Sequence, residues 1–411
     1  MVYGIVAEYN PFHNGHLYQI QTLRQRDTRA AIVVVMSGSF TQRGTPAILD
    51  KWQRAKLALL GGANLVLELP TCFVLQSAEG FATGAIRLLA SLNIVDKLSF
   101  GVGNAPNILW QAATAIDNAE TQKLLHQGMH QGLSYAQALS QALASLYSVD
   151  ENALREPNTI LGLEYLRALQ KFAPHIIPLP LRRETALHND RTLHEKMASA
   201  SAIRKALEDK NPFTAIQNVV PKFTAEALKP MQITLPSLEL LYRPLLVRLL
   251  TTSREELTTY ANMGMGDGYE YAIFQAAKNT STLTEFLACL QSRRYSLSRL
   301  RRAILCFLLG IKIKDIKKEG YVRPHYARLL GADTQGIRLL RAIKKNGQIP
   351  VLTKISSVLQ EKTLQQNFMQ LTPWQKMLTF DIRATNLWQW TLSNHGQAMK
   401  DYLTSPVILQ R

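Results

Sequence analysis

Two histidines lie three residues apart near the start of the chain, in the run His13-Asn14-Gly15-His16. If this run opens a helix, both rings lie on one face and can donate hydrogen bonds to the same anion. A helix start also offers free backbone N–H groups and the positive end of the peptide dipole, and Gly15 has no side chain to block a close approach. The run therefore predicts a site that holds a triphosphate and stabilises pyrophosphate as it leaves; the alternative is two ordinary surface or core histidines.

A second candidate phosphate site lies in residues 197–205. Here Ser199 and Ser201 precede an Ile-Arg pair, a pattern typical of a helix start at which hydroxyl and backbone N–H groups bind phosphate. Arg204 follows one turn into that helix. Because serine begins many helices, the prediction depends on pairing this segment with the histidine run, and together they indicate one nucleotide site.

Five short apolar runs supply the strands that would position these residues, and helical patterns lie between them. The runs span residues 2–7, 31–35, 64–67, 97–101 and 175–179. Alternating strands and helices predict an α/β fold, a Rossmann-like doubly wound parallel sheet with right-handed crossovers. Ligands bind such sheets beyond the carboxyl ends of the strands, so residues 10–16 and the loop after Val35 are expected to face one pocket.

Other residues at expected strand and helix ends suit a nucleotide. Arg43, in the loop 36–46, can bind a phosphate or a carboxylate through paired hydrogen bonds. Gly101 lets the backbone approach a ring or ribose, or serves a plain turn, and Asn158 lies at a helix start where it can bond a base or a sugar. The helix after this loop carries the basic residues Lys51, Arg54 and Lys56, which could form only its solvated face. We favour that interpretation for Lys56.

The composition indicates a globular protein of two or three domains, since its 411 residues are 46% hydrophobic. The three cysteines, Cys72, Cys289 and Cys306, are far apart, which argues against a disulfide framework or a zinc site and fits a reducing cytoplasm. The N-terminus shows no basic-then-apolar leader, and no apolar run approaches the ~18 residues of a membrane helix. We therefore expect a cytoplasmic protein with neither an export signal nor a membrane span.

The net charge of +17 is unevenly distributed. Residues 291–350 hold 15 Lys or Arg against 3 Asp or Glu, an excess typical of proteins that bind a phosphate backbone, although a solvated basic face gives the same count. From about residue 211 the strand pattern stops and helical patterns dominate. Arginines beside a tyrosine in the basic segment suit phosphate contacts and stacking on an unpaired base. These residues are Arg293, Arg294, Tyr295, Arg299, Arg301 and Arg302. The alternative is a helix whose leucines face the core and whose arginines face water, and both can hold on one helix.

The histidine run and the serine segment resemble the HxGH and Ser-x-Ser/Thr-x-Ile-Arg signatures of the nucleotidylyl transferase (HIGH) superfamily, relatives of class I aminoacyl-tRNA synthetases. More narrowly, five segments look like the tRNA(Met) cytidine acetate ligase family: residues 7–17, 36–44, 51–52, 157–158 and 198–204. The resemblance recurs at residues 294–295, 299–300 and 326–331. Together with the patterns above, it predicts an ATP-binding catalytic domain over residues 1–210 and a mostly helical, basic tRNA-binding domain over residues 211–411.

Members of this family use ATP and acetate to make acetyl-adenylate and pyrophosphate, and then acetylate N4 of the wobble cytidine of elongator tRNA(Met). The resemblance implies that His13, His16, Ser199 and Arg204 are catalytic. It also implies a larger set of ATP contacts, with the arginine at 182 or 183 left open: Ala7, Glu8, Tyr9, Asn10, Pro11, Phe12, His13, Asn14, Gly15, His16, Leu17, Tyr18, Gln19, Ile20, Gly101, Asn158, Arg182, Arg183 and Ser201. Because no clustered carboxylates suggest a metal cage, Mg²⁺ is expected to arrive with ATP. No structural metal, membrane or protein partner is implied.

Two other functions are compatible with the sequence. An adenylyl transferase acting on a small phosphorylated metabolite would share the superfamily motifs, but it would not need a basic helical half of ~200 residues. A non-catalytic RNA-binding protein on the same scaffold would not need the histidines, Ser199 and Arg204 intact. The acetate ligase is the function we predict.

Overall fold

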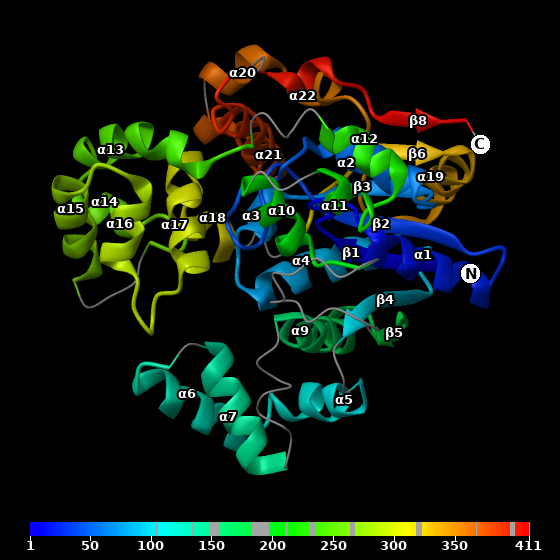
Figure 1. Ribbon diagram of the computed structural model, residues 1–411, viewed down its shortest axis with the longest axis horizontal. Helices are drawn as coiled ribbons and strands as arrows, with labels where there is room; N and C mark the ends of the chain where they lie inside the picture. Colours follow the sequence, from blue (N-terminus) through cyan, green and yellow to red (C-terminus); the bar gives the residue numbers. More distant parts are fainter. Residues whose placement is uncertain are drawn as a thin grey trace.

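The computed structural model describes residues 1–102, 106–133, 135–147, 157–182, 197–209, 213–229, 235–263, 268–317, 323–366, 368–394 and 399–410. Among these residues, eight strands form one sheet in the order β5-β4-β1-β2-β3-β6-β7, with β8 paired to β6 (Figure 1). Neighbours among β1 to β5 are parallel, as predicted. The strands are β1 (Val2–Ala7), β2 (Ala31–Ser37), β3 (Leu65–Leu69), β4 (Lys97–Val102), β5 (Ile177–Arg182), β6 (Ala327–Asp333), β7 (Val351–Leu352) and β8 (Val407–Leu409).

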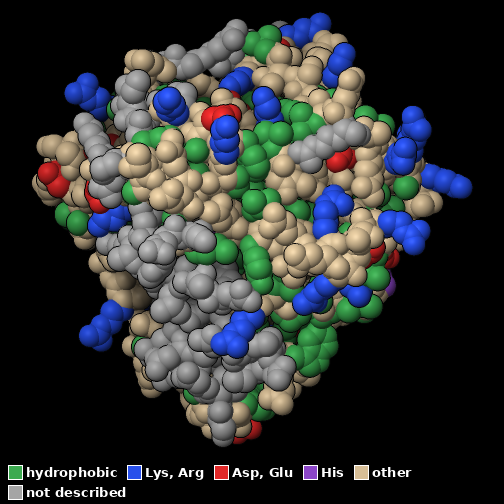
Figure 2. All heavy atoms as spheres, turned by 45° about the vertical axis from the view of Figure 1, so that its right-hand side comes forward, with side chains coloured by type: hydrophobic (Ala, Val, Ile, Leu, Met, Phe, Trp, Pro, Cys, Tyr) green, Lys and Arg blue, Asp and Glu red, His purple; other side chains and the backbone are tan. Residues whose placement is uncertain are grey.

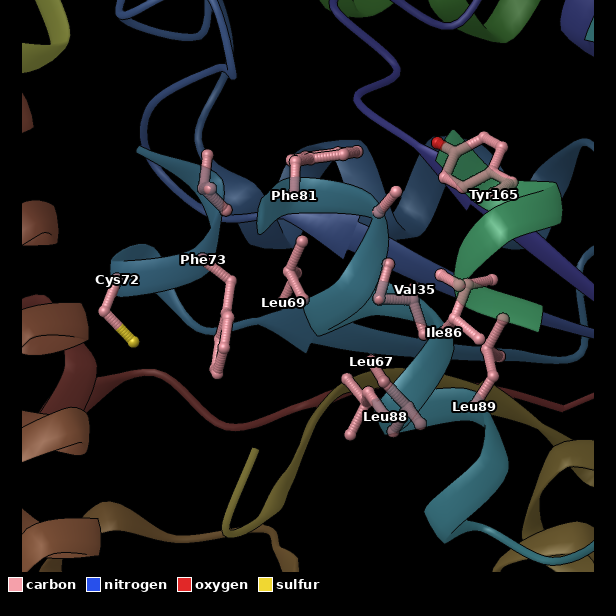
Figure 3. Packing of buried hydrophobic residues seen from close by; sticks show 14 of the residues in the cluster. Val35, Leu67, Leu69, Cys72, Phe73, Phe81, Ile86, Leu88, Leu89 and Tyr165 are labelled. Carbon is pink, nitrogen blue, oxygen red and sulfur yellow. The ribbon is translucent and has the colours of Figure 1, made fainter. Parts of the chain in front are cut away.

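The helices of the first half cover both faces of the sheet, except for two that pack on each other away from it, α6 and α7 (Figure 1). They are α1 (Asn14–Arg26), α2 (Lys51–Leu60), α3 (Thr71–Val74), α4 (Ala78–Ser91), α5 (Pro106–Ala115), α6 (Ala119–His130), α7 (Tyr135–Tyr147), α9 (Pro157–Phe172) and α10 (Ala200–Glu208). Successive side chains of a strand point to opposite faces, and β2 is buried on both. Val33 and Val35 belong to the core formed with α4 and α9, which Figure 3 shows around Phe81 and Tyr165. Val34 belongs to the opposite core, formed with α1 and α2.

Three strands of the second half complete the sheet, so the expectation that strands stop at residue 211 is wrong. β6 pairs antiparallel with β3, and β7 and β8 pair parallel with β6. The predicted division at residue 210 therefore does not separate the sheet from the helices. The strands escaped the sequence analysis because β6 is rich in leucine, alanine and glycine rather than β-branched residues, while β7 and β8 span only two and three residues.

Helices of the second half form a unit with its own apolar core beside the sheet. Leu245, Phe286 and Phe307 are among the residues of that core, and α17 joins it to the sheet because Leu305 and Leu309 face the other way, into the core below β3. Figure 1 shows α13 to α17 gathered on one side of the sheet. Among the described helices, only α13 to α17 contribute buried residues to this separate core. The helices of the second half are α11 (Phe213–Gln217), α12 (Lys222–Leu228), α13 (Tyr242–Leu250), α14 (Arg254–Thr258), α15 (Tyr269–Asn279), α16 (Leu283–Leu290), α17 (Leu297–Leu309), α18 (Ile313–Lys317), α19 (Thr334–Asn346), α20 (Glu361–Gln366), α21 (Pro373–Gln389) and α22 (Lys400–Leu403), with short 3-10 turns η2 (Leu238–Leu241), η3 (Ile355–Ser357) and η4 (Phe368–Gln370), among the described residues. No helix in the described ranges has both the length and the apolarity to cross a membrane.

A buried cluster of charges ties the C-terminal segment to α2 and β3. Lys51 Nζ donates to both carboxylate oxygens of Glu68 at 2.9 Å and to Asp401 Oδ1 at 2.8 Å, and it is 0% exposed. Arg328 on β6 pairs with the same two carboxylates. Of the interpretations left open for Lys51 and Arg54, the solvated face is excluded: β6 and α22 cover Lys51, and Arg54 is fully buried against the ends of β1 and β2. Lys56 is exposed, as predicted.

Asp381 on α21 lies beside this cluster and makes stability depend on pH. Its carboxylate accepts hydrogen bonds from Thr71 N at 2.7 Å and from Tyr326 Oη at 2.5 Å. Burial, and then the negative charge of Glu68, raise the pKa of Asp381 to about 7. In the unfolded chain it titrates near its ordinary value of about 3.9. Between these pKa values the folded protein keeps a proton that the unfolded chain has lost, so the free energy of unfolding falls as pH rises from about 4 to 7.

The variant Asp381→Asn is therefore expected to lose this pH dependence, because an amide stays neutral throughout. Urea denaturation at several pH values between 5 and 7.5 measures it. We expect the free energy of unfolding of the wild-type protein to fall over that interval, and that of the variant to fall less. Equal slopes in the two proteins would contradict the assignment.

Candidate active site

The two histidines meet at the start of α1, directly after β1. His13 is the N-cap residue, and its Nδ1 accepts a hydrogen bond from Gly15 N at 3.1 Å. His16 Nδ1 accepts one from His13 N at 3.2 Å, so the two side chains and the helix start form a capping box. The two rings stack with centroids 3.7 Å apart. The predicted strand, turn and helix start is thus present.

This capping fixes what the histidines present to a ligand. A neutral imidazole has one acceptor nitrogen and one donor nitrogen. Because Nδ1 of each ring accepts a backbone N–H, Nε2 carries the proton in both His13 and His16. Both rings are therefore hydrogen-bond donors on their remaining nitrogen, which suits phosphate oxygens and does not suit the abstraction of a proton.

A cavity of 210 Å³ opens beyond the carboxyl ends of β1 and β4. It brings together the histidine pair, Gly101, Asn158 and the serine segment, which are far apart in the sequence. Loop 36–46 contributes Arg43, so the expectation that this loop and residues 10–16 face one pocket is confirmed. The cavity is lined by Val6, Ala7, Glu8, Tyr9, Asn10, His13, His16, Gln19, Gln42, Arg43, Ala78, Phe81, Phe100, Gly101, Asn158, Leu161, Tyr165, Ser199, Ala200, Ser201 and Arg204.

The serine segment forms the opposite wall. Ser199 is the N-cap residue of α10, where its Oγ accepts a hydrogen bond from Ala202 N, and it lies 2.9 Å from Ser201 Oγ. Arg204, one turn later, donates from Nη1 to the backbone oxygen of Asn10 at 2.6 Å. Burial lowers the pKa of Arg204, the negative charge of Glu8 opposes this, and the positive charge of Arg43 adds to the lowering. Two arginines thus lie close enough in this cavity to act on one anion.

Arg54 holds the ends of β1 and β2 in place beneath the cavity. Its guanidinium donates to the backbone oxygens of Glu8 at 2.6 Å and Ser37 at 3.1 Å, and to that of Gly38. Its Nε donates to Leu49 O at 3.1 Å. Burial lowers the pKa of Arg54 to about 10. One buried side chain therefore fixes the turn after β1 relative to the loop after β2.

The comparisons with known proteins agree with this geometry. A model of the HIGH nucleotidyl transferase family matches residues 1–402. The chain is 35% identical to tRNA(Met) cytidine acetate ligase of a Thermoanaerobacter species over 413 residues, 98% of both chains, and 32% identical to the protein of the same name from Halothermothrix orenii over 430 residues, 99% of both. The chain belongs to the HIGH nucleotidyl transferase family and, within it, to the tRNA(Met) cytidine acetate ligases.

Two crystal structures of Thermotoga maritima TmcAL have the same fold over 100% of both chains. The apo form gives a TM-score of 0.88 at 29% identity. The form bound with alpha-thio ATP gives 0.86 at 28% identity. The predicted α/β class and the resemblance to this family are therefore confirmed.

Half of the run predicted to contact ATP lies outside the cavity lining of this family member. Phe12 and Ile20 are buried in the core with α2, and Phe12 lies against Gly61. A helix turns its side chains through all directions, so one continuous run cannot line one pocket. The residues of the run outside the lining are Pro11, Phe12, Asn14, Gly15, Leu17, Tyr18 and Ile20. Arg182, at the end of β5, is exposed and also outside the lining, and Arg183 lies outside the described residues.

The lining also contains residues that the sequence analysis did not select. Gln42 donates from its backbone N to Glu8 Oε1 at 2.7 Å, beside the selected Arg43. Phe81, Phe100 and Tyr165 supply apolar wall from α4, β4 and α9. Phe100 and Tyr165 pack edge to face, with centroids 5.6 Å apart. Their sequence signal was that of ordinary core residues, and only the packing of α9 on β4 places them at a cavity.

The candidate RNA-binding residues divide into exposed and buried ones. Tyr295 is 5% exposed and packs against Tyr269, with ring centroids 4.1 Å apart and the rings tilted by 46°, while Arg299 lies over its ring at 4.8 Å. The expectation that Tyr295 stacks on an unpaired base is therefore wrong, because α15 covers the ring. Arg302 is 8% exposed. Arg293 and Arg294 are exposed, and Arg299 and Arg301 are half-buried.

The basic segment 291–350 does not form a single surface. Its first arginines precede or lie on α17, whereas exposed Arg338, Arg341 and Lys345 lie on α19, at the other side of the molecule in Figure 1. Figure 2 shows lysine and arginine side chains spread over the side that includes α19, with few acidic side chains between them. The charge count thus describes two separate surfaces.

Proposed function

We propose that this chain joins acetate to ATP, forming acetyl-adenylate and pyrophosphate, and then transfers the acetyl group to N4 of the wobble cytidine of elongator tRNA(Met). The observation that carries the proposal is that His13 and His16, from one end of the first 210 residues, line the same cavity as Ser199 and Arg204, from the other. Membership of the family supports the same reaction, since relatives named for it match the whole chain and a related structure carries an ATP analogue.

In the first step, an acetate oxygen attacks the α-phosphorus, and the bond to the departing pyrophosphate breaks. Positioning and charge stabilisation supply most of such a rate, because no proton has to move at the reacting centre. We assign His13 and His16 to donate through Nε2 to oxygens of the leaving pyrophosphate. Ser199, Ser201 and Arg204 bind phosphate oxygens at the start of α10, and Arg43 does so from the facing loop. Gly101 and Asn158 lie where the nucleoside binds.

In the second step, the N4 amine of cytidine attacks the acetyl carbonyl carbon, the bond to the AMP oxygen breaks, and the amine loses a proton. An acyl phosphate is a good electrophile, so this step needs less assistance than the first. Glu8 supplies the sole carboxylate among the described lining residues, which is too few for a protein metal cage. Mg²⁺ is therefore proposed to arrive with ATP, where it neutralises phosphate charge.

The RNA partner is proposed to lie along the start of α17. Arg293, Arg294, Arg299 and Arg301 are exposed or half-buried there and offer phosphate contacts. Arg301 lies beside the loop that carries Arg43, since a Cβ built on Gly44 would lie 2.8 Å from Arg301 Cβ. A tRNA backbone bound at this helix would therefore lead toward the nucleotide. Because ATP and tRNA are the proposed substrates, we place the protein in the cytoplasm.

The proposal is tested with the purified full-length chain, ATP, radiolabelled acetate and bulk tRNA. Label in acid-precipitable RNA is followed and then mapped by nuclease digestion. We expect label as N4-acetylcytidine. A transcript of elongator tRNA(Met) should accept it, and the same transcript with uridine at the wobble position should not. Pyrophosphate release without RNA labelling would indicate a metabolite adenylyl transferase, and neither signal would indicate a binding protein.

A further inference from the structure

Loop 40–46, which brings Gln42 and Arg43 to the cavity, rests on the side of α17. Gly44 has φ +71°, and a Cβ built on it would lie 2.7 Å from Arg302 N and 2.8 Å from Arg301 Cβ. A contact this close, in a conformation that favours glycine, indicates that the loop backbone lies directly on the helix. The loop and the helix are more than 250 residues apart in sequence and belong to the two halves of the chain.

One side chain of α17 crosses this contact. Arg302 donates from Nη1 to the backbone oxygen of Gln42 at 3.1 Å, and its side chain is almost fully buried. Burial lowers the pKa of Arg302 to about 10. A buried cation needs hydrogen-bond acceptors to offset the loss of water, and here the acceptor is a carbonyl of the loop. Arg302 was predicted to contact RNA, but it is buried and contacts the loop that lines the cavity instead.

Gln42 connects Arg302 to residues that line or border the cavity. The backbone N of Gln42 donates to Glu8 Oε1 at 2.7 Å, and Gln42 Nε2 donates to Gln76 O at 3.1 Å. The loop is closed on itself by Thr41 N, which donates to Thr45 O at 2.9 Å. Gln42 is therefore held from both sides, by Arg302 of the helical unit and by Glu8 of β1, and the adjacent Arg43 projects into the cavity.

We propose that Arg302 is a positioning residue for nucleotide binding: it holds loop 40–46 so that Arg43 meets the phosphates of ATP. This inference rests on the proposed function only for the identity of the nucleotide. Under this proposal, the helical unit positions a loop of the nucleotide site in addition to binding RNA. Without the Arg302 contact, the loop keeps its own hydrogen bonds and those to Glu8 and Gln76, but it is no longer held from the side of α17.

The test is the affinity for ATP, measured by isothermal titration calorimetry without acetate or tRNA. Arg302→Ala is expected to bind ATP about tenfold more weakly, the effect of one lost charged contact. Arg302→Lys keeps the charge and one donor, and should recover most of that loss. Arg383→Ala is the matched control, because Arg383 Nη1 also donates to a backbone oxygen, that of Leu309 at 3.1 Å, but lies outside the cavity lining.

A double-mutant cycle separates positioning from general destabilisation. If Arg302 acts through Arg43, then Arg302→Ala should change ATP affinity less than twofold in an Arg43→Ala background. Full additivity of the two effects, or unchanged affinity in Arg302→Ala, would overturn the inference. If Arg302→Ala unfolds, Arg302→Met, which fills most of the same space but has no donor for Gln42 O, takes its place in both backgrounds. Failure of the wild-type protein to bind ATP would instead overturn the proposed function, and the inference with it.

Discussion

Replacing His16 with alanine is expected to slow acetyl-adenylate formation by about 10²- to 10³-fold, the usual cost of removing one donor from a developing oxyanion. The reason is structural: His16 Nδ1 is occupied by His13 N, so Nε2 is a donor, and the ring lines the cavity. Acetate-dependent exchange of label between pyrophosphate and ATP measures this step without tRNA. An exchange rate within threefold of the wild-type rate would contradict the assignment.

The His16→Ala variant also removes half of the capping box, so its fold has to be monitored. We expect loss of that cap to cost about 1 kcal/mol of stability, too little to unfold the protein. His16→Gln keeps an acceptor for His13 N and restores the common capping-box residue. It should therefore regain the stability, while its exchange rate reports on the imidazole ring rather than on the cap. His126→Ala, at an exposed position of α6, is the matched control and should exchange as the wild type does.

Replacing Lys51 with methionine is expected to lower the free energy of unfolding by about 3–5 kcal/mol, the cost of removing one partner from a buried ion pair. Methionine has nearly the same length and fills the same space, so the loss is one of charge. It leaves Glu68 and Asp401 close together with only Arg328 to compensate them. Urea denaturation measures the change.

Lys56→Met is the control for this substitution, because Lys56 lies on the same helix and is exposed. Surface substitutions usually change stability by less than about 0.5 kcal/mol. Equal stability of the Lys51 and Lys56 variants would show that the cluster is not held together by its lysine. A large loss in the Lys51 variant alone would show that the C-terminal segment, through Asp401, is part of the folded core of the nucleotide-binding half.

Much of the catalytic half could be predicted because its signals are local. Five apolar runs became β1 to β5, with ends within a few residues of those expected. Both helix starts were readable, since His13 and Ser199 cap their helices through atoms two or three residues away. The rule that ligands bind beyond the carboxyl ends of parallel strands then predicted that the histidine run and the loop with Arg43 face one pocket, and the cavity lining agrees.

The burial of three charged or aromatic residues could not be predicted from the sequence, because the type and spacing of such side chains do not indicate whether another segment covers them. Lys51 and Arg54 have the spacing of a solvated helix face, yet β6 and α22, from the other end of the chain, cover Lys51. Tyr295 has the neighbours of a base-stacking residue, yet α15 covers it. In each case the covering element lies far away in sequence.

The residues alone were enough to predict the two helix starts that line the candidate site, because caps, turns and strand ends act over a few residues, whereas the reaction was inferred from the resemblance to a known family. The tertiary structure decided which arginines of the basic segment face solvent and which face the nucleotide loop. It also decided that the last strands of the chain complete the sheet. The physical reason is that burial and ion pairing depend on contacts between segments hundreds of residues apart, such as Lys51 with Asp401 and Arg302 with Gln42.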